Sequence, residues 1–157
     1  MIEYFQNKHL SDEYIVTKLS EFWDEDMPAG DQTTECAISE NVHIKAEIQV
    51  MEELVFAGKE IIPHCFGKDC QVTINQEDGN LLSSGDVLGM VTGSARDILS
   101  RERVMLNLIQ RLCGIATLSR KYAKIANPFN VIILDTRKTT PGLRPFEKCA
   151  VAIGGSY

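Results

Sequence analysis

The first 95 residues alternate between apolar side chains at helical spacing and apolar side chains at every second position. Residues 11–24 begin with Ser11, a good N-cap residue, and repeat apolar side chains every three or four positions, so they predict a helix. Residues 43–50 alternate apolar and polar side chains, which predicts a half-buried strand. A short helix is expected at 57–66, a strand that runs into an Asp-Gly turn at 71–80, and another strand at 86–93. Together these segments predict a small antiparallel sheet with helices packed on it, an α+β arrangement.

An apolar stripe from residue 94 onward predicts a long helix. Ser94 and Asp97 form a start similar to a capping box, with aspartate in place of the preferred glutamate. Gly114 is expected to end or bend this helix. Asn127-Pro128 ends the segment that follows, because proline disfavours a helical conformation in the residue before it.

The segment after Pro128 has the order of a β/α unit. Four consecutive apolar residues, 131–134, predict a buried strand, and a helix is expected around residues 146–153. Parallel β/α folds place their ligands at the carboxyl ends of strands. Only one such unit is present, and one unit cannot close a sheet.

The residues Asp135-Thr136-Arg137-Lys138 directly follow the predicted strand. Two adjacent cations repel each other and gain nothing from packing, so an anionic ligand would explain their position. Arg137 offers a planar fork to a carboxylate or phosphate, and Lys138 adds a mobile point charge. A solvated basic loop is the alternative.

The charges of the chain are unevenly distributed. The net charge is −6, but residues 1–95 hold 5 lysines and 18 acids, whereas residues 96–157 hold 11 basic residues and 4 acids. Such asymmetry indicates two functional zones, and the basic one suits a small polyanion. No basic face carries interleaved aromatic residues, so nucleic acid is the weaker interpretation.

Arg103 lies on the predicted long helix without an acid three or four residues away on either side. It is therefore available to something outside its own helix. A plain surface arginine is the alternative. Arg101, in contrast, can pair with Asp97, four residues before it.

Several classes of protein and site are not supported by the sequence. No apolar run reaches the length of a membrane span, and no secretory signal precedes the first helix, so we expect a cytoplasmic protein with reduced cysteines. The five cysteines include no CxxC pair, and no residues have the spacing of metal ligands. In "AGDQTT", residues 29–34, a turn stabilised by the Asp31 side chain is favoured over an active-site loop.

Three segments together resemble one family, quinolinate phosphoribosyltransferase, also called nicotinate-nucleotide pyrophosphorylase (carboxylating). They are "EDMPAGDQTT" at 25–34, "ERVMLNLIQRLCGIAT" at 102–117 and "ILDTRKTTPGLRPFEKCAVAIGG" at 133–155. The last is the most specific, because its matches stay in register over more than twenty residues. The resemblance covers essentially the whole chain, but the chain is similar to only the first half or so of a family member.

The resemblance implies an α+β sandwich N-terminal domain, expected at residues 1–105, followed at 106–157 by the first β/α unit of an incomplete α/β barrel. It implies transfer of a phosphoribosyl group from phosphoribosyl pyrophosphate to quinolinate with decarboxylation. The products would be nicotinate mononucleotide, carbon dioxide and pyrophosphate, in NAD biosynthesis. Mg²⁺ is the implied cofactor, bound with phosphoribosyl pyrophosphate.

The resemblance also implies roles for four residues. Thr136, Arg137 and Lys138 fall on the part of the family pattern that lines the quinolinate and phosphate pocket. Arg103 falls on an arginine that reaches the active site of the neighbouring subunit, so a homodimer or higher homo-oligomer is expected.

The family pattern continues beyond the Gly-Gly pair with a His-Arg pair, a further lysine and acids near the metal, none of which lies in these 157 residues. We therefore expect the isolated chain to be inactive and assign it no catalytic residue and no metal ligand. Two alternatives stay open: a phosphoribosyltransferase for another acid, and a non-catalytic oligomerisation or anion-binding module.

Overall fold

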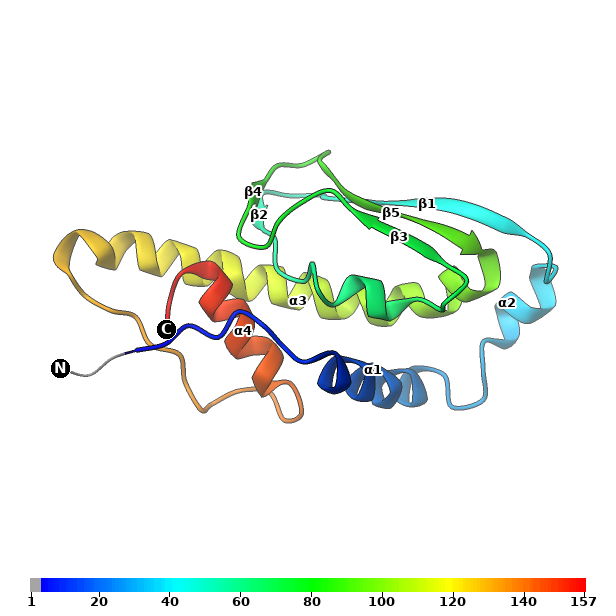
Figure 1. Ribbon diagram of the computed structural model, residues 1–157, viewed down its shortest axis with the longest axis horizontal. Helices are drawn as coiled ribbons and strands as arrows, with labels where there is room; N and C mark the ends of the chain where they lie inside the picture. The colour runs from blue at the N-terminus through cyan, green and yellow to red at the C-terminus, as the bar shows by residue number, and fades with distance from the viewer. Residues whose placement is uncertain (1–3) are drawn as a thin grey trace.

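The computed structural model describes residues 4–157 (Figure 1). Its helices and strands follow one another in this order: α1 (Asp12–Asp26), α2 (Gln32–Ala37), β1 (His43–Gln49), β2 (Leu54–Val55), the 3₁₀ helix η1 (Ile62–Cys65), β3 (Gln71–Ile74), β4 (Leu81–Leu82), β5 (Val87–Ser94), α3 (Ala95–Ala126), the 3₁₀ helix η2 (Asn127–Phe129) and α4 (Arg144–Gly154). The α+β arrangement expected for the first 95 residues is confirmed.

β5 is the central strand of a three-stranded antiparallel sheet in the order β1-β5-β3. Val91 of β5 lies opposite Ala46 of β1 and Val72 of β3. β2 and β4 form a separate antiparallel pair. At Gly89 a Cβ atom would overlap the Thr73 carbonyl oxygen, so the close approach of β3 requires glycine at this position.

The two long helices, α1 and α3, begin at the serines that the sequence predicted as their caps. The Ser11 hydroxyl accepts a hydrogen bond from the Tyr14 N–H at the start of α1. Ser94 caps α3 in the same way, through the N–H of Asp97. In a full capping box the Asp97 carboxylate would also accept a hydrogen bond from the Ser94 N–H. No such bond is present among the contacts of residues 4–157, because the carboxylate instead accepts from the Gly67 N–H at 2.8 Å and from Arg101 Nε at 2.6 Å.

The expectation that Gly114 ends or bends the long helix is wrong. α3 continues without interruption from Ala95 to Ala126. A glycine inside a helix costs about 1 kcal/mol relative to alanine. The buried neighbours Leu112, Cys113 and Ala116 anchor both sides of this position in the core, which outweighs that cost.

The expected buried strand at 131–134 is also wrong. The segment is extended but has no neighbouring strand among the described residues, and the side chains of Val131, Ile132 and Leu134 are each about half exposed. The Val131 N–H donates to the Ala126 carbonyl at 3.3 Å, and the Tyr157 N–H donates to the Ile133 carbonyl at 2.9 Å. Just after the segment, the Asp135 N–H donates to the Tyr157 carbonyl. An apolar run becomes a strand only where another strand can complete its hydrogen bonds.

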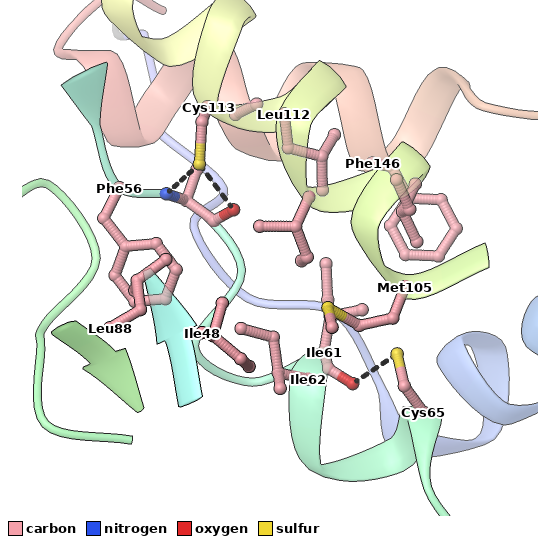
Figure 2. Close-up of a cluster of buried hydrophobic side chains, with 14 of the residues drawn as sticks. Ile48, Phe56, Ile61, Ile62, Cys65, Leu88, Met105, Leu112, Cys113 and Phe146 are labelled. Atoms are coloured by element: carbon pink, nitrogen blue, oxygen red, sulfur yellow. Dashed lines mark hydrogen bonds between the residues drawn. The ribbon is translucent and has the colours of Figure 1, made fainter. Parts of the chain in front are cut away.

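One hydrophobic core joins the sheet to the helices. In Figure 1, α3 passes along the sheet, and α1 and α4 pack against it on its other side. Figure 2 shows side chains of this core in one cluster, with Ile48 and Leu88 of the strands toward one end, near Phe56 and Ile62, and Met105 of α3 and Phe146 of α4 toward the other. The core thus connects the two zones of the chain, and the expected domain boundary between residues 105 and 106 falls inside α3 and stays a prediction.

All five cysteines are free thiols, as expected from their spacing. Cys113 is buried and exchanges hydrogen bonds with the backbone of Ala57, and Cys65 donates to the Ile61 carbonyl (Figure 2). Burial raises the pKa of Cys113 to about 11 and the pKa of Cys65 to about 12, so both thiols stay protonated. Within residues 4–157, no helix combines the length and the hydrophobicity that a membrane crossing requires.

Candidate functional site

The loop 135–140, "DTRKTT", presents two cations whose side chains are uncommitted. Arg137 and Lys138 are both exposed, and neither side chain has a hydrogen bond or an ion pair with another described residue. The backbone around them is held: the Lys138 N–H donates to the Thr136 hydroxyl at 3.1 Å. The structure thus places Thr136, Arg137 and Lys138 together on the surface with their charges available to an anion.

Helix α4 holds this loop at its start and middle. Lys148 pairs with the Asp135 carboxylate at 2.6 Å. Arg144 donates from Nε to the Thr139 hydroxyl at 3.0 Å and from Nη2 to the Arg137 carbonyl at 3.2 Å. One guanidinium therefore bridges the residues on either side of Lys138.

The end of the loop is held by a buried carboxylate. Glu147 Oε1 accepts two hydrogen bonds from Arg111 of α3, from Nη2 at 2.6 Å and Nε at 2.9 Å. Glu147 Oε2 accepts from the Thr140 N–H at 3.2 Å, and Arg111 Nη2 also donates to the Thr140 hydroxyl at 2.5 Å. Desolvation by burial acts to raise the pKa of Glu147, but hydrogen bonds from Arg111 and Thr140 outweigh it and lower that pKa, so the carboxylate stays ionised.

The periodicity of α4 places its polar residues toward the loop. Its buried face repeats at helical spacing: Phe146, Cys149, Ala150 and Ile153. Arg144, Glu147 and Lys148 are three and four residues apart and so lie along a neighbouring stripe. Pro145 suits the first turn because it has no N–H to leave unpaired, and Gly155 ends the helix with a positive φ of 105°. The helix expected around residues 146–153 is confirmed.

Arg103 is not free as the sequence suggested. Its Nη1 donates to both carboxylate oxygens of Asp26, at 3.1 and 3.3 Å, and its side chain is 68% exposed. Asp26 is the last residue of α1, so a search for acids on the arginine's own helix could not find it. Among the described residues no contact joins Arg103 to the loop, and its expected role in a neighbouring subunit stays a prediction.

An open hollow of about 580 Å³ lies beside the loop. Its walls come from the end of α1, from the middle of α3 and from the turn after the loop, and include Asp26, Asn107, Arg111, Thr140 and Leu143. Asp26, the partner of Arg103, and Thr140, the last residue of the loop, thus line the same hollow. Its lining mixes polar and apolar side chains, which suits a small molecule with charged groups or a segment of another chain.

Four residues that hold the loop were missed in the sequence: Arg111, Arg144, Glu147 and Lys148. Arg111 gave the same signal as Arg103, since no acid lies three or four residues from it on either side. The polar stripe of α4 was also readable at helical spacing. The pairing of Arg111 with Glu147 was not, because 36 residues separate them.

The acids near the loop do not form a metal site. Within residues 4–157, no cluster of three or more His, Cys, Asp or Glu side chains is placed to hold a metal ion. Asp135 is engaged by Lys148 and Glu147 by Arg111. The residues described here therefore do not fit Mg²⁺. At residues 29–34, the Asp31 side chain accepts from the Thr34 N–H at 3.0 Å, so the expected turn is confirmed as the N-cap of α2.

Comparison with known proteins gives the same family for both parts of the chain. A family model described as "Quinolinate phosphoribosyl transferase, N-terminal domain" matches residues 31–113, more than half of the chain. A second, described as "Quinolinate phosphoribosyl transferase, C-terminal domain", matches residues 115–157.

Curated relatives carry the corresponding enzyme names. The probable nicotinate-nucleotide pyrophosphorylase (carboxylating) of Bacillus subtilis is 43% identical over 142 residues, which are 88% of this chain and 49% of the relative. The protein of the same name in Methanothermobacter thermautotrophicus is 43% identical over 129 residues, which are 80% of this chain and 46% of the relative. The chain therefore spans about half the length of these relatives.

Solved structures share the fold. The nicotinate-nucleotide pyrophosphorylase of Francisella tularensis superposes with a TM-score of 0.91 at 29% identity, over 99% of this chain and 56% of that one. NadC from Streptococcus pyogenes gives a TM-score of 0.91 at 33% identity, over 96% of this chain and 55% of that one. The expected sandwich followed by the start of a barrel agrees with both.

Proposed function

This chain belongs to the quinolinate phosphoribosyltransferase family, and we propose that the complete gene product joins quinolinate to phosphoribosyl pyrophosphate with loss of carbon dioxide. The products are nicotinate mononucleotide and pyrophosphate, which makes the protein an enzyme of NAD biosynthesis. The observation that carries the proposal is the loop 135–140, where Arg137 and Lys138 project uncommitted charges from an anchored backbone.

The chemistry of the loop suits this reaction. Quinolinate has two carboxylates on adjacent ring carbons, and phosphoribosyl pyrophosphate carries several phosphate charges. Arg137 can hold a carboxylate with two parallel hydrogen bonds, and Lys138 can neutralise a second anionic group beside it. Holding the dianion in one orientation directs the ring nitrogen toward the ribose carbon, which lowers the entropic part of the barrier.

The bonds change in two stages. The ring nitrogen forms a bond to the ribose C1 while the bond from C1 to pyrophosphate breaks. The bond between the ring and the carboxylate next to the nitrogen then breaks, carbon dioxide leaves, and the ring carbon takes a proton. The electron pair left on that carbon is stabilised by the adjacent ring cation. In this scheme Arg137 and Lys138 bind and orient the substrate, and no described residue serves as the acid or the base.

Mg²⁺ is proposed to enter with phosphoribosyl pyrophosphate. The acids of residues 4–157 do not fit as its ligands, so no step is derived through the ion on these residues.

A homodimer or higher homo-oligomer is proposed as the catalytic unit, with Arg103 reaching the neighbouring active site. The exposed position of Arg103 supports this, because a side chain 68% exposed can leave Asp26 at little cost. A cytoplasmic location is also proposed, supported by five cysteines that are all free thiols.

The activity of the complete gene product tests the proposal. Incubation with quinolinate, phosphoribosyl pyrophosphate and Mg²⁺ should release carbon dioxide and nicotinate mononucleotide in equal amounts, and Arg137→Ala should reduce the rate at least tenfold. Nicotinate in place of quinolinate should release no carbon dioxide. Turnover of another acid but not of quinolinate would make the protein a different phosphoribosyltransferase, and turnover of none would favour a binding module.

A further inference from the structure

Glu147 is a buried charged residue, and it is not one of the residues expected to contact the substrate. It is 7% exposed, and it is the one buried charged residue among residues 4–157. Burying a carboxylate is costly unless it is paired and hydrogen-bonded. Here both oxygens are used, so the position of Glu147 is set by its partners.

The two oxygens of Glu147 face two different parts of the structure. Oε1 is held by Arg111 of α3, and Oε2 receives the N–H of Thr140 in the loop. Arg111 completes a triangle by donating to the Thr140 hydroxyl. A rigid core helix is thus connected through one carboxylate to the backbone of a surface loop.

We propose that Glu147 is a positioning residue. It fixes the backbone of residues 136–140 before the ligand binds, so that Arg137 and Lys138 already face their anion. Thr140 is only two residues after Lys138 and three after Arg137, so its fixed backbone limits where both side chains can reach. The identity of the anion rests on the proposed function, whereas the fixing of the loop does not.

The physical reason is preorganisation. A loop that is mobile before binding must lose conformational freedom when it meets its ligand, and this loss weakens binding without removing any contact. Two uncommitted cations on a mobile loop would also separate by mutual repulsion. The Glu147 carboxylate, which holds the backbone of the loop at Thr140, therefore increases the affinity of the loop for its anion although it does not contact the ligand.

The other two anchors support the loop more weakly. Arg144 is exposed, and in the Lys148–Asp135 pair the carboxylate side chain is 23% exposed, against 10% for that of Glu147. Exposed pairs of this kind contribute little and are screened by salt. The buried Glu147 is thus the anchor whose removal should matter most.

The experiment compares Glu147→Gln with the unaltered chain by ¹⁵N relaxation of the backbone amides. Glutamine keeps the size of the side chain but replaces one carboxylate oxygen with an NH₂ group, so a donor then faces either Arg111 or the Thr140 N–H. The amides of residues 136–140 should have order parameters near 0.85 in the unaltered chain and below about 0.6 in the variant. A second variant, Thr140→Val, removes only the hydroxyl that Arg111 reaches and should give a smaller change in the same direction.

Asp78→Asn is the matched control. Asp78 is also a partly buried carboxylate that fixes a loop, because its Oδ1 accepts from the N–H groups of Gly58 and Lys59 at 2.7 and 3.0 Å. Asparagine keeps one oxygen that can accept from both N–H groups, so Asp78→Asn removes a partly buried charge without removing these contacts and should leave residues 58 and 59 and residues 136–140 rigid. A general loss of stability would instead loosen both loops in both variants.

Binding of quinolinate to the complete gene product separates positioning from simple structural support. At a temperature where all variants are folded, Glu147→Gln should weaken quinolinate binding at least tenfold, whereas Asp78→Asn should leave it unchanged. Unchanged order parameters at 136–140 would overturn the inference, and so would mobile residues 136–140 with unchanged quinolinate affinity. If the unaltered gene product binds no quinolinate, the proposed function fails, and the relaxation result alone supports or overturns the presetting of the loop.

Discussion

Arg111 of α3 and Glu147 of α4 are 36 residues apart in the chain, yet Arg111 Nη2 lies 2.6 Å from Glu147 Oε1. The glutamate is buried and the arginine side chain is 45% exposed, so the pair lies at the edge of the core beside the loop 135–140. The ion pair joins the long helix α3 to α4, the helix that follows the basic loop. It also gives the chain a titratable group whose charge the folded state requires.

The lowered pKa of Glu147 predicts a pH dependence of stability. Burial opposes ionisation, but Arg111 and Thr140 favour it more strongly, so the folded-state pKa lies below the unfolded value of about 4.3. The stabilisation is therefore complete above about pH 4.3 and is lost as the pH falls through the lower, folded-state value. Glu147→Gln should cost about 1–3 kcal/mol at pH 7, because it leaves a polar partner unsatisfied.

Urea unfolding of the unaltered chain and of Glu147→Gln at pH 7, 5 and 3 measures this. The gap between their free energies of unfolding should be the same at pH 7 and 5 and smaller at pH 3. Asp31 and Asp97 also have lowered pKa values, but both proteins contain them, so their effects cancel in the difference. A gap that stays constant to pH 3 would show that Glu147 does not titrate in this range.

We expect Arg137→Ala to weaken quinolinate binding without lowering the stability of the fold. The Arg137 side chain has no hydrogen bond or ion pair with any described residue, so its removal should change the free energy of unfolding by less than about 0.5 kcal/mol. In the complete gene product it should raise the dissociation constant of quinolinate at least tenfold, about 1.4 kcal/mol. Calorimetric titration measures the affinity, with the exposed Lys124→Ala as the control that removes a cation elsewhere.

Arg103 gives a test of the proposed oligomer. Arg103→Ala and Arg137→Ala should each inactivate the complete gene product, and a mixture of the two, unfolded and refolded together, should recover part of the activity. Recovery follows because a mixed dimer can build one site from the intact Arg137 of one subunit and the intact Arg103 of the other. If the mixture is no more active than the separate variants, Arg103 does not act across the interface.

The local elements of this fold were readable in the sequence, and the long-range ones were not. α1 is specified by Ser11 and by the apolar spacing of residues 12–26. Both signals lie within one short stretch of sequence, so they can be recognised without knowing the rest of the fold. The run 131–134 looked like a strand because periodicity reports hydrophobicity and not whether a neighbouring strand exists. The loop cations were found because their adjacency is a local anomaly, whereas the Glu147–Arg111 contact depends on how two helices pack.

Gly114→Ala should stabilise the chain. Gly114 lies inside α3 and is exposed, and a Cβ atom added there would meet no atom within 4 Å beyond its chain neighbours and the backbone of its own helix. Alanine loses less backbone freedom on folding than glycine, so the free energy of unfolding should rise by about 1 kcal/mol. For a chain of this size that corresponds to a melting temperature about 2–4 °C higher.

Gly154→Ala is the matched contrast. Its Cβ would lie 2.5 Å from the Ala116 carbonyl oxygen, so this substitution should lower the melting temperature. An unchanged or lower melting temperature for Gly114→Ala would mean that α3 is not a continuous helix at this position.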